Sequence, residues 1–287
     1  MKKILVPIDF SQNSINALHV AANIAQKSGA VLEMLHVNLA VVYAAPFSEY
    51  VAVSDYIVED RQYDATATEG LEKLKMEILS DPAYSKLDIR TRVEDGYLHS
   101  SVRNVANEDD VDLVVMGTKG TSGVSEFLVG SNTEKVIRTA PCPVLAVPEN
   151  IQKFDPKVVM LPSTLKRDQR AAFKYLAQWE QIFDFVVKVL YLNNPLNLPT
   201  DGSAEAQKNR LAESTGLKKT DVIMTTETFF EDNAILGAAD QCNADLIVMA
   251  THQRQGLSHF LFGSITEDTI NHSHLPVLAV PIGWRED

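Results

Sequence analysis

The sequence predicts an α/β fold in which two tandem copies of one domain each contain a doubly wound, parallel, five-stranded sheet. Three observations favour this fold. The chain of 287 residues repeats itself internally, short apolar runs alternate with longer stretches of helical periodicity, and each copy ends on an apolar run. The length allows two domains of ordinary size, each with a core of its own.

The internal repeat is clearest near the end of each copy. Residues 116–148 align with residues 249–281 without a gap, and 17 of the 33 aligned positions are identical. Both stretches close on Pro-Val-Leu-Ala-Val-Pro. The offset is 133 residues here but 155 at the front of each copy, where Pro7 pairs with Pro162. The repeat predicts domains over 1–148 and 156–287, joined by a polar stretch.

The two offsets make the second copy 22 residues shorter, and the missing residues fall opposite residues 38–86. Within that span, residues 40–60 contain proline and several aromatic side chains. This segment is interpreted as an added loop or lid of the first copy. A surface loop without a role is the alternative.

Strands and helices alternate in both copies. β-branched apolar runs predict strands, and longer amphipathic stretches predict helices. In the first copy the predicted strands cover 3–8, 31–37, 87–93, 112–116 and 144–147, and the predicted helices cover about 12–28, 61–80, 98–108 and 131–139. In the second copy the predicted strands lie near 157–162, 185–192, 221–227, 245–250 and 277–280.

Several of these runs are apolar at every position, which is typical of strands in a parallel sheet covered by helices on both faces. Each copy is therefore predicted to be a Rossmann-like domain. The closing strand of each copy is wholly apolar and is predicted to pair with its counterpart instead of remaining an open edge. That pairing gives the chain an internal pseudo-two-fold, a pseudo-dimer within one polypeptide.

Composition narrows the classes of partner and compartment. A formal net charge of −12 and a pI near 5.0 disfavour nonspecific binding to nucleic acid or to an anionic membrane. An anionic ligand therefore needs a local site. The first apolar run is too short for a secretory signal, and no run approaches the roughly 18 residues of a membrane helix. Cys142 and Cys242 stand far apart without metal-ligand spacing. A cytoplasmic location is expected.

A glycine-containing loop follows the fourth strand of the first copy. Met116 leads into Gly117 and Gly120, nine residues follow, and Gly130 and Ser131 open a helix. Glycines at the carboxyl end of a parallel strand permit positive φ and close backbone approach, and a helix amino terminus attracts phosphate. The hydroxyls of Ser131 and Thr133 are further candidate donors. The alternative is an ordinary tight turn followed by an N-cap at Ser131.

This pattern, Gly-x2-Gly-x9-Gly-Ser after an apolar strand, occurs together with Val6-Pro7-Ile8-Asp9 and a closing Pro-Cys-Pro-Val-Leu. In these motifs both halves resemble universal stress proteins, and the first half resembles their ATP-binding class. The resemblance implies the sheet architecture of adenine-nucleotide α-hydrolases, a stress-response role, a homodimer with unidentified protein partners, and ATP, ADP or AMP as ligand, with Mg²⁺ as a candidate companion. Lys119 and Asn132 stand where that family varies.

The resemblance also implies roles for individual residues. Asp9 is expected to contact the adenosine portion, and Pro7 and Val37 to frame the base. The residues expected to hold the ribose and phosphates are Met116, Gly117, Gly120, Gly130, Ser131, Asn132 and Thr133. From the residues alone, Asp9 is either a ligand acceptor or an N-cap for the helix beginning at Ser11.

The second copy departs from the motif. Ala250 stands where Gly117 is expected, Gln253 replaces Gly120, and Thr164 replaces Asp9, although Gly263 and Ser264 remain. Larger side chains at these positions intrude on phosphate space or strain the backbone. One nucleotide per chain is expected, with a second half that packs and does not bind nucleotide. The four histidines of this half, at 252, 259, 272 and 274, match no metal-ligand spacing and are interpreted as solvated polar residues.

Three functions remain open at this point. The first is a nucleotide-dependent regulator. The second is a weak ATP-hydrolysing enzyme, although the loop region contains no nucleophile–base pair, carboxylate dyad or pyrophosphate-loop motif of the SGGxDS or HxGH type. The third is a nucleotide-free dimeric scaffold, which the altered second half favours and the intact first half disfavours.

Overall fold

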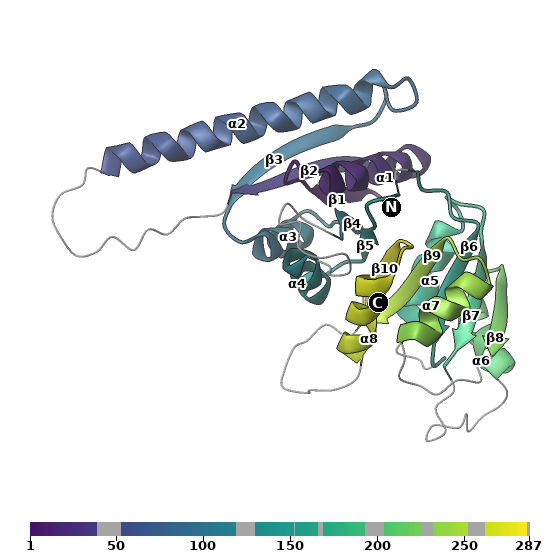
Figure 1. Ribbon diagram of the computed structural model, residues 1–287. Helices are drawn as coiled ribbons and strands as arrows, with labels where there is room; N and C mark the ends of the chain where they lie inside the picture. Colours follow the sequence, from purple (N-terminus) through teal and green to yellow (C-terminus); the bar gives the residue numbers. More distant parts are fainter. Residues whose placement is uncertain are drawn as a thin grey trace, which may run out of the picture.

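A computed structural model of the chain describes residues 1–38, 53–118, 130–151, 153–165, 169–192, 204–224, 232–251 and 262–285 (Figure 1). In the first half the strands are β1 (Lys3–Pro7), β2 (Val31–Asn38), β3 (Ile89–Asp95), β4 (Leu113–Gly117) and β5 (Val144–Val147). The helices between them are α1 (Gln12–Ser28), α2 (Val53–Ser80), α3 (Leu98–Glu108) and α4 (Ser131–Thr139).

The second half repeats this alternation. Its strands are β6 (Val158–Ser163), β7 (Val186–Tyr191), β8 (Thr220–Met224), β9 (Leu246–Thr251) and β10 (Val277–Pro281). Its helices are α5 (Arg170–Trp179), α6 (Ala204–Thr215), α7 (Asp232–Gln241) and α8 (Phe262–His272). The alternation confirms the predicted α/β class in both halves.

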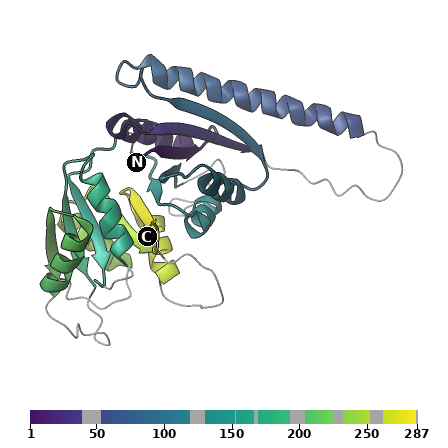
Figure 2. The ribbon, with the colours of Figure 1, turned by 180° about the vertical axis from the view of Figure 1, so that it is seen from behind.

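All ten strands form one sheet in the order β3-β2-β1-β4-β5-β10-β9-β6-β7-β8. Within each half neighbouring strands are parallel, and β1 lies between β2 and β4. Figure 1 shows α2 on one side of β2 and β3, with α3 and α4 on the other side, and Figure 2 shows the same arrangement from behind. The doubly wound order places the carboxyl ends of β1, β2 and β4 side by side.

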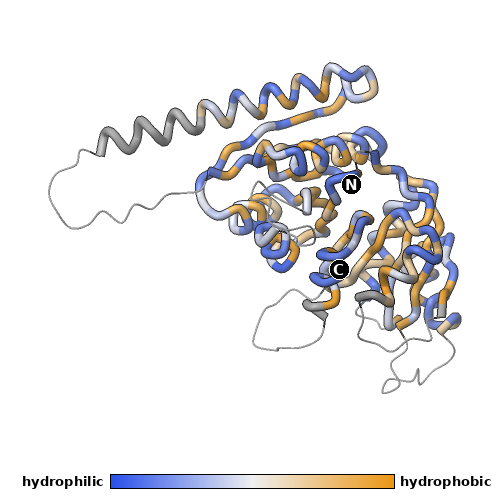
Figure 3. The backbone as a smooth tube through the Cα atoms, in the orientation of Figure 1, coloured by the Kyte–Doolittle hydropathy of each residue, from blue (hydrophilic) through white to orange (hydrophobic). Residues whose placement is uncertain are grey.

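The sheet is buried because its strands are apolar. Every residue of β4, β5, β9 and β10 is buried, as are four of the five in β1. Figure 3 shows apolar segments along these strands, whereas the coloured part of α2 alternates apolar and polar positions. The continuous apolar runs thus fill a sheet covered on both faces, as predicted.

The two halves join through the antiparallel pair of β5 and β10, which confirms the predicted pairing of the closing strands. Leu145 pairs with Leu278, Val144 with Ala279, and Ala146 with Val277. Leu145 and Leu278 are equivalent positions of the repeat, so each pairs with its own counterpart. The pseudo-two-fold therefore passes through this pair.

The starts of two elements differ from the prediction by two residues or more. Strand β3 begins at Ile89, two residues later than expected, because the Leu87 amide is engaged in a turn and donates to the Tyr84 carbonyl at 3.0 Å. Helix α2 begins at Val53, well before residue 61, since residues 53–60 contain no proline or glycine to stop it. The predicted loop or lid is therefore helical over 53–60, and its remainder lies outside the described residues.

Asp112 links both ends of the chain at the junction between the halves. Its buried carboxylate accepts the backbone amides of Lys2 and Lys3 and also binds the guanidinium of Arg285. Arg285 also pairs with Asp110, and the Tyr175 hydroxyl donates to the Asp112 carbonyl at 3.2 Å. Asp112 thus holds the backbone at the start of β1 and forms an ion pair with Arg285 of the second half.

Burial alone would raise the pKa of Asp112. The two amide donors and Arg285 together lower it by more, so the net pKa lies below the usual range of the carboxyl group. The repeat provides a comparison at Asp245, the equivalent position in the second half. Asp245 Oδ2 accepts the amides of Lys157 and Val158 at 2.8 and 2.9 Å, and this residue is exposed. Both aspartates thus accept backbone amides at the start of a strand. Asp112 is buried and binds an arginine, whereas Asp245 is exposed.

We expect Asp112→Ala to lower the free energy of unfolding at pH 7 by about 2 to 4 kcal/mol, because buried donors and a guanidinium lose their acceptor. Asp245→Ala is the matched control, with an expected loss of about 1 kcal/mol. Because the folded-state pKa of Asp112 is depressed, its stabilisation is present above about pH 4 and disappears as the pH falls through the folded pKa. Urea unfolding at several pH values measures this difference, and equal losses for the two variants would contradict it.

Candidate functional site

A cavity of about 290 Å³ lies where β1, β2 and β4 end and where α3 and α4 begin. This is the edge at which ligands bind in open α/β sheets. Nine of the ten residues expected to bind nucleotide line it. They are Pro7, Asp9, Val37, Met116, Gly117, Gly130, Ser131, Asn132 and Thr133. The tenth, Gly120, lies outside the described residues.

Gly117 is required at its position by close packing and not by its dihedral angle. Its φ is not positive, so of the two properties that glycine offers at this place, positive φ and close backbone approach, the structure uses the second. A Cβ on Gly117 would lie 2.8 Å from the carbonyl oxygen of Asn13 and 2.9 Å from its carbonyl carbon. The end of β4 and the first turn of α1 thus touch backbone to backbone, which leaves no room for a methyl group.

The first turn of α4 is tied to the end of β4. The amide of Gly130 donates to the Thr118 carbonyl at 2.7 Å, and the buried Thr133 hydroxyl donates to the Gly117 carbonyl at 2.9 Å. The Thr133 hydroxyl is therefore committed to the backbone and positions the helix. Gly130 is the N-cap of α4 and, as a glycine, provides no side-chain cap. The start of this helix lines the cavity through Gly130 and the exposed residues Ser131 and Asn132.

Asp9 does not cap α1, which corrects one of the two sequence-based interpretations. The N-cap is Ser11, whose hydroxyl accepts the amide of Ser14 at 3.3 Å. Asp9 Oδ1 accepts both the amide and the hydroxyl of Ser11, at 3.0 and 2.6 Å. Partial burial raises the pKa of Asp9, but the Ser11 hydrogen bonds lower it more, so the net shift is downward. The carboxylate is thus ionised near neutral pH and lies at the cavity wall.

Several lining residues were missed by the sequence analysis. They are Ile8, Ser14, His36, Gly96, Tyr97, Leu98, His99 and Lys135. His36 Nδ1 lies 2.7 Å from the carbonyl of Ile8, and its ring lies 5.0 Å from that of Phe10. The glycine motif gives no signal for residues 96–99. Their position after the third strand is the signal, because every strand of a parallel sheet ends at the same edge.

The equivalent end of the second half has a different polar arrangement. Ser163, Gln169 and Tyr191 stand where the first half has Ile8, Ser14 and His36, and all three are buried. The Ser163 hydroxyl hydrogen-bonds with Gln169 and accepts the amide of Leu165 at 3.0 Å. Thr164 follows β6 where Asp9 follows β1, so at this described position the second half has a hydroxyl in place of a carboxylate. Gln253, which replaces Gly120, lies outside the described residues.

The described residues contain no group of three or more His, Cys, Asp or Glu side chains placed to hold a metal. His272 Nδ1 lies 2.9 Å from the carbonyl of Asp268, and His274 lies 3.5 Å from Asp240, whereas His252 and His259 are outside the described ranges. Cys142 is buried, which raises the pKa of its thiol to about 12. Among the helices that the structure describes, none is long and apolar enough to span a membrane.

Comparisons with known proteins give one consistent result. The model of the universal stress protein family matches residues 1–148 and again residues 161–281. Universal stress protein YxiE of Bacillus subtilis (strain 168) is 34% identical over 146 residues, which is 50% of this chain and 97% of that protein. The crystal structure of a universal stress protein from Archaeoglobus fulgidus DSM 4304 has a TM-score of 0.67 at 19% identity, covering 98% of this chain and 96% of the other.

The contact between Gly117 and Asn13 predicts that Gly117→Ala lowers the free energy of unfolding by about 1 to 3 kcal/mol, since backbone atoms must move to admit the methyl group. Gly237→Ala is the matched control. A Cβ at Gly237 meets nothing within 4 Å inside α7, so helix propensity predicts a gain of about 1 kcal/mol. Urea denaturation measures both, and a Gly117→Ala protein as stable as the parent would refute the close-contact account.

Proposed function

The chain belongs to the universal stress protein family as a tandem of two such domains, and from this premise we propose that its first half binds ATP, ADP or AMP. We further propose that the bound nucleotide makes the protein a nucleotide-dependent regulator in a stress response. The observation that carries the proposal is the convergence of nine motif residues, from three strands and a helix, on one cavity.

The chemistry along the cavity suits an adenine nucleotide. Pro7 and Val37 offer apolar contacts for a base, and the ionised Asp9 is an acceptor for a ribose hydroxyl or an amine. The amino terminus of α4 attracts phosphate through its free amides and the positive end of its dipole. Lys135, on the first turns of the same helix, adds a positive charge to the lining.

Mg²⁺ fits this proposal as a companion of the phosphates. Mg²⁺ in nucleotide sites is held mainly by phosphate oxygens and water, with one or two protein ligands. Such a site needs no preformed cluster of carboxylates. The residues described around the cavity are consistent with this, because Asp9 is the single carboxylate among the lining residues.

Regulation follows from mass action. A ligand that binds one conformation stabilises it by a free energy that grows with the logarithm of one plus the ratio of free ligand concentration to dissociation constant, and contacts that depend on that conformation change with it. The second half has a different part in this proposal. It completes the sheet through β10 and carries no equivalent of Asp9 or Gly117. We propose that it packs and does not bind nucleotide.

Isothermal titration of ATP with Mg²⁺ into the full-length chain tests the proposal. We expect one nucleotide per chain and binding that is lost or weakened at least tenfold in Asp9→Ala, since one charge-assisted hydrogen bond is worth about 1.5 to 3 kcal/mol. Thr164→Ala, at the equivalent position of the second half, is the control and is expected to bind as the parent does. Two sites per chain would contradict the assignment of the second half. An absence of binding would refute the nucleotide proposal and favour the alternative of a nucleotide-free scaffold.

A homodimer is also part of the proposal. Because β5 and β10 already pair within the chain, a second copy must associate through other surfaces. Light scattering coupled to size-exclusion chromatography, with and without ATP, is expected to give a mass of twice 31.7 kDa. A mass of one chain at micromolar concentration would show that the internal pseudo-dimer is the whole assembly.

A further inference from the structure

The residues that line the cavity follow successive strands of the sheet, and this order gives the direction in which the proposed nucleotide lies. Strand β3 is followed in the sheet by β2, β1 and β4. The base-framing Val37 belongs to β2, whereas the phosphate-binding amino terminus of α4 follows β4. Residues that follow β3 therefore lie beyond the base end of the proposed nucleotide. Tyr97 and His99 are two such residues, and both line the cavity.

Tyr97 is 66% exposed, and of the exposed large apolar side chains in the described residues it is the one that lines the cavity. Its ring centroid lies 6.0 Å from that of His99, with the planes tilted by 35°. A tyrosine that served the core would bury its ring. Tyr97 instead lines the cavity as a residue outside the core, and its ring has the imidazole of His99 beside it, so core packing does not account for its size.

The backbone of Tyr97 is held firmly although its ring is exposed. Gly96 precedes it with a φ of +135°, a conformation that favours glycine, and the Gly96 amide donates to the Asn38 carbonyl at 2.9 Å. The Tyr97 carbonyl accepts the amides of Ser100 and Ser101 at 2.9 and 3.0 Å. The residue is thus fixed between the end of β2 and the first turn of α3.

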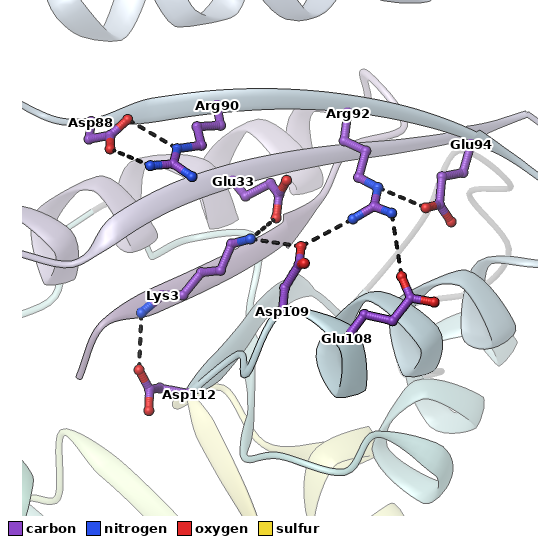
Figure 4. A network of polar contacts seen from close by, with 9 residues as sticks. All are labelled: Lys3, Glu33, Asp88, Arg90, Arg92, Glu94, Glu108, Asp109 and Asp112. Carbon is purple, nitrogen blue, oxygen red and sulfur yellow. Dashed lines mark hydrogen bonds and ion pairs between the residues drawn. The ribbon is translucent and has the colours of Figure 1, made fainter.

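The far end of α3 is also fixed, by a network of ion pairs beneath the sheet (Figure 4). Asp109 lies 2.8 Å from Lys3 on β1 and 3.1 Å from Arg92 on β3, and Glu108 lies 3.7 Å from Arg92. Hydrogen bonds from Lys3 lower the pKa of Asp109, with nearby positive charges acting in the same direction. Both ends of α3 are therefore attached to the sheet, so Tyr97 has a fixed place relative to Val37.

From these observations we propose that the Tyr97 ring stacks on the base of the bound nucleotide and is a positioning residue for that base, with His99 supporting the ring. The inference rests on the proposed nucleotide site and adds a residue that the glycine motif does not contain. Stacking on an aromatic ring contributes to binding of a base in proportion to the overlap of the two faces and not to the phosphate charge. The effect of Tyr97 is thus predicted to be the same for nucleotide and nucleoside.

The test is isothermal titration of the full-length chain with three probes: ATP with Mg²⁺, adenosine, and inorganic tripolyphosphate. Tyr97→Ala is expected to weaken ATP and adenosine by the same factor, about 5- to 100-fold, from the usual effect of removing a stacking ring. Tyr97→Phe keeps the ring and is expected to stay within about threefold of the parent. Tripolyphosphate binding is expected to be unchanged in both variants.

Met76→Ala is the control for loss of an exposed apolar side chain. Met76 is 65% exposed on α2 and is not among the cavity-lining residues, so nucleotide affinity should not change. An unchanged melting temperature for Tyr97→Ala shows that the fold is intact. If the parent binds ATP and Tyr97→Ala binds it equally well, or loses affinity for ATP but not for adenosine, the stacking inference is overturned while the nucleotide site stands. If the parent binds no nucleotide, both fall.

Discussion

The antiparallel contact of β5 with β10 joins two five-stranded sheets into one sheet of ten, and the rest of the molecule depends on it. Both strands are fully buried, so separating them would expose two apolar edges with unpaired amides and carbonyls. Arg138 on α4 and Glu267 on α8 reinforce the contact with hydrogen bonds of 2.5 and 2.7 Å. Both halves therefore need an apolar closing strand for packing, independently of whether they bind a ligand.

The same geometry allows the two halves to differ. Residues that hold the sheet together occupy the middle of the strands, whereas Asp9, Gly117 and their equivalents Thr164 and Ala250 occupy the carboxyl ends. A substitution at a strand end changes the cavity edge without opening the core. The second half differs from the first at these positions and still supplies β10 and the Arg285 contact with Asp112. Under the proposed function, the chain is one nucleotide-binding domain stabilised by a related partner domain.

The sequence was sufficient for the strands and their pairing, because these depend on local apolar patterns and on the repeat. The family resemblance was sufficient to select nine residues that line one cavity. The sequence was insufficient where distant segments meet. The contact of Gly117 with Asn13 joins parts of the chain that no local pattern connects, and Ser11 took the capping role considered for Asp9. Tyr97 and His99 belong to none of the sequence motifs. Their place at the cavity follows from topology, which brings the ends of parallel strands to one edge.

Hydrogen exchange measured by mass spectrometry on the full-length chain, with and without ATP and Mg²⁺, tests the division between the halves most directly. If the first half alone binds, amides around residues 8–11 and 130–134 exchange more slowly with nucleotide, because ligand contacts and mass action suppress local opening. The equivalent amides at 163–166 and 263–267 keep their rates. Equal slowing in both halves, or slowing confined to the second, would contradict the account.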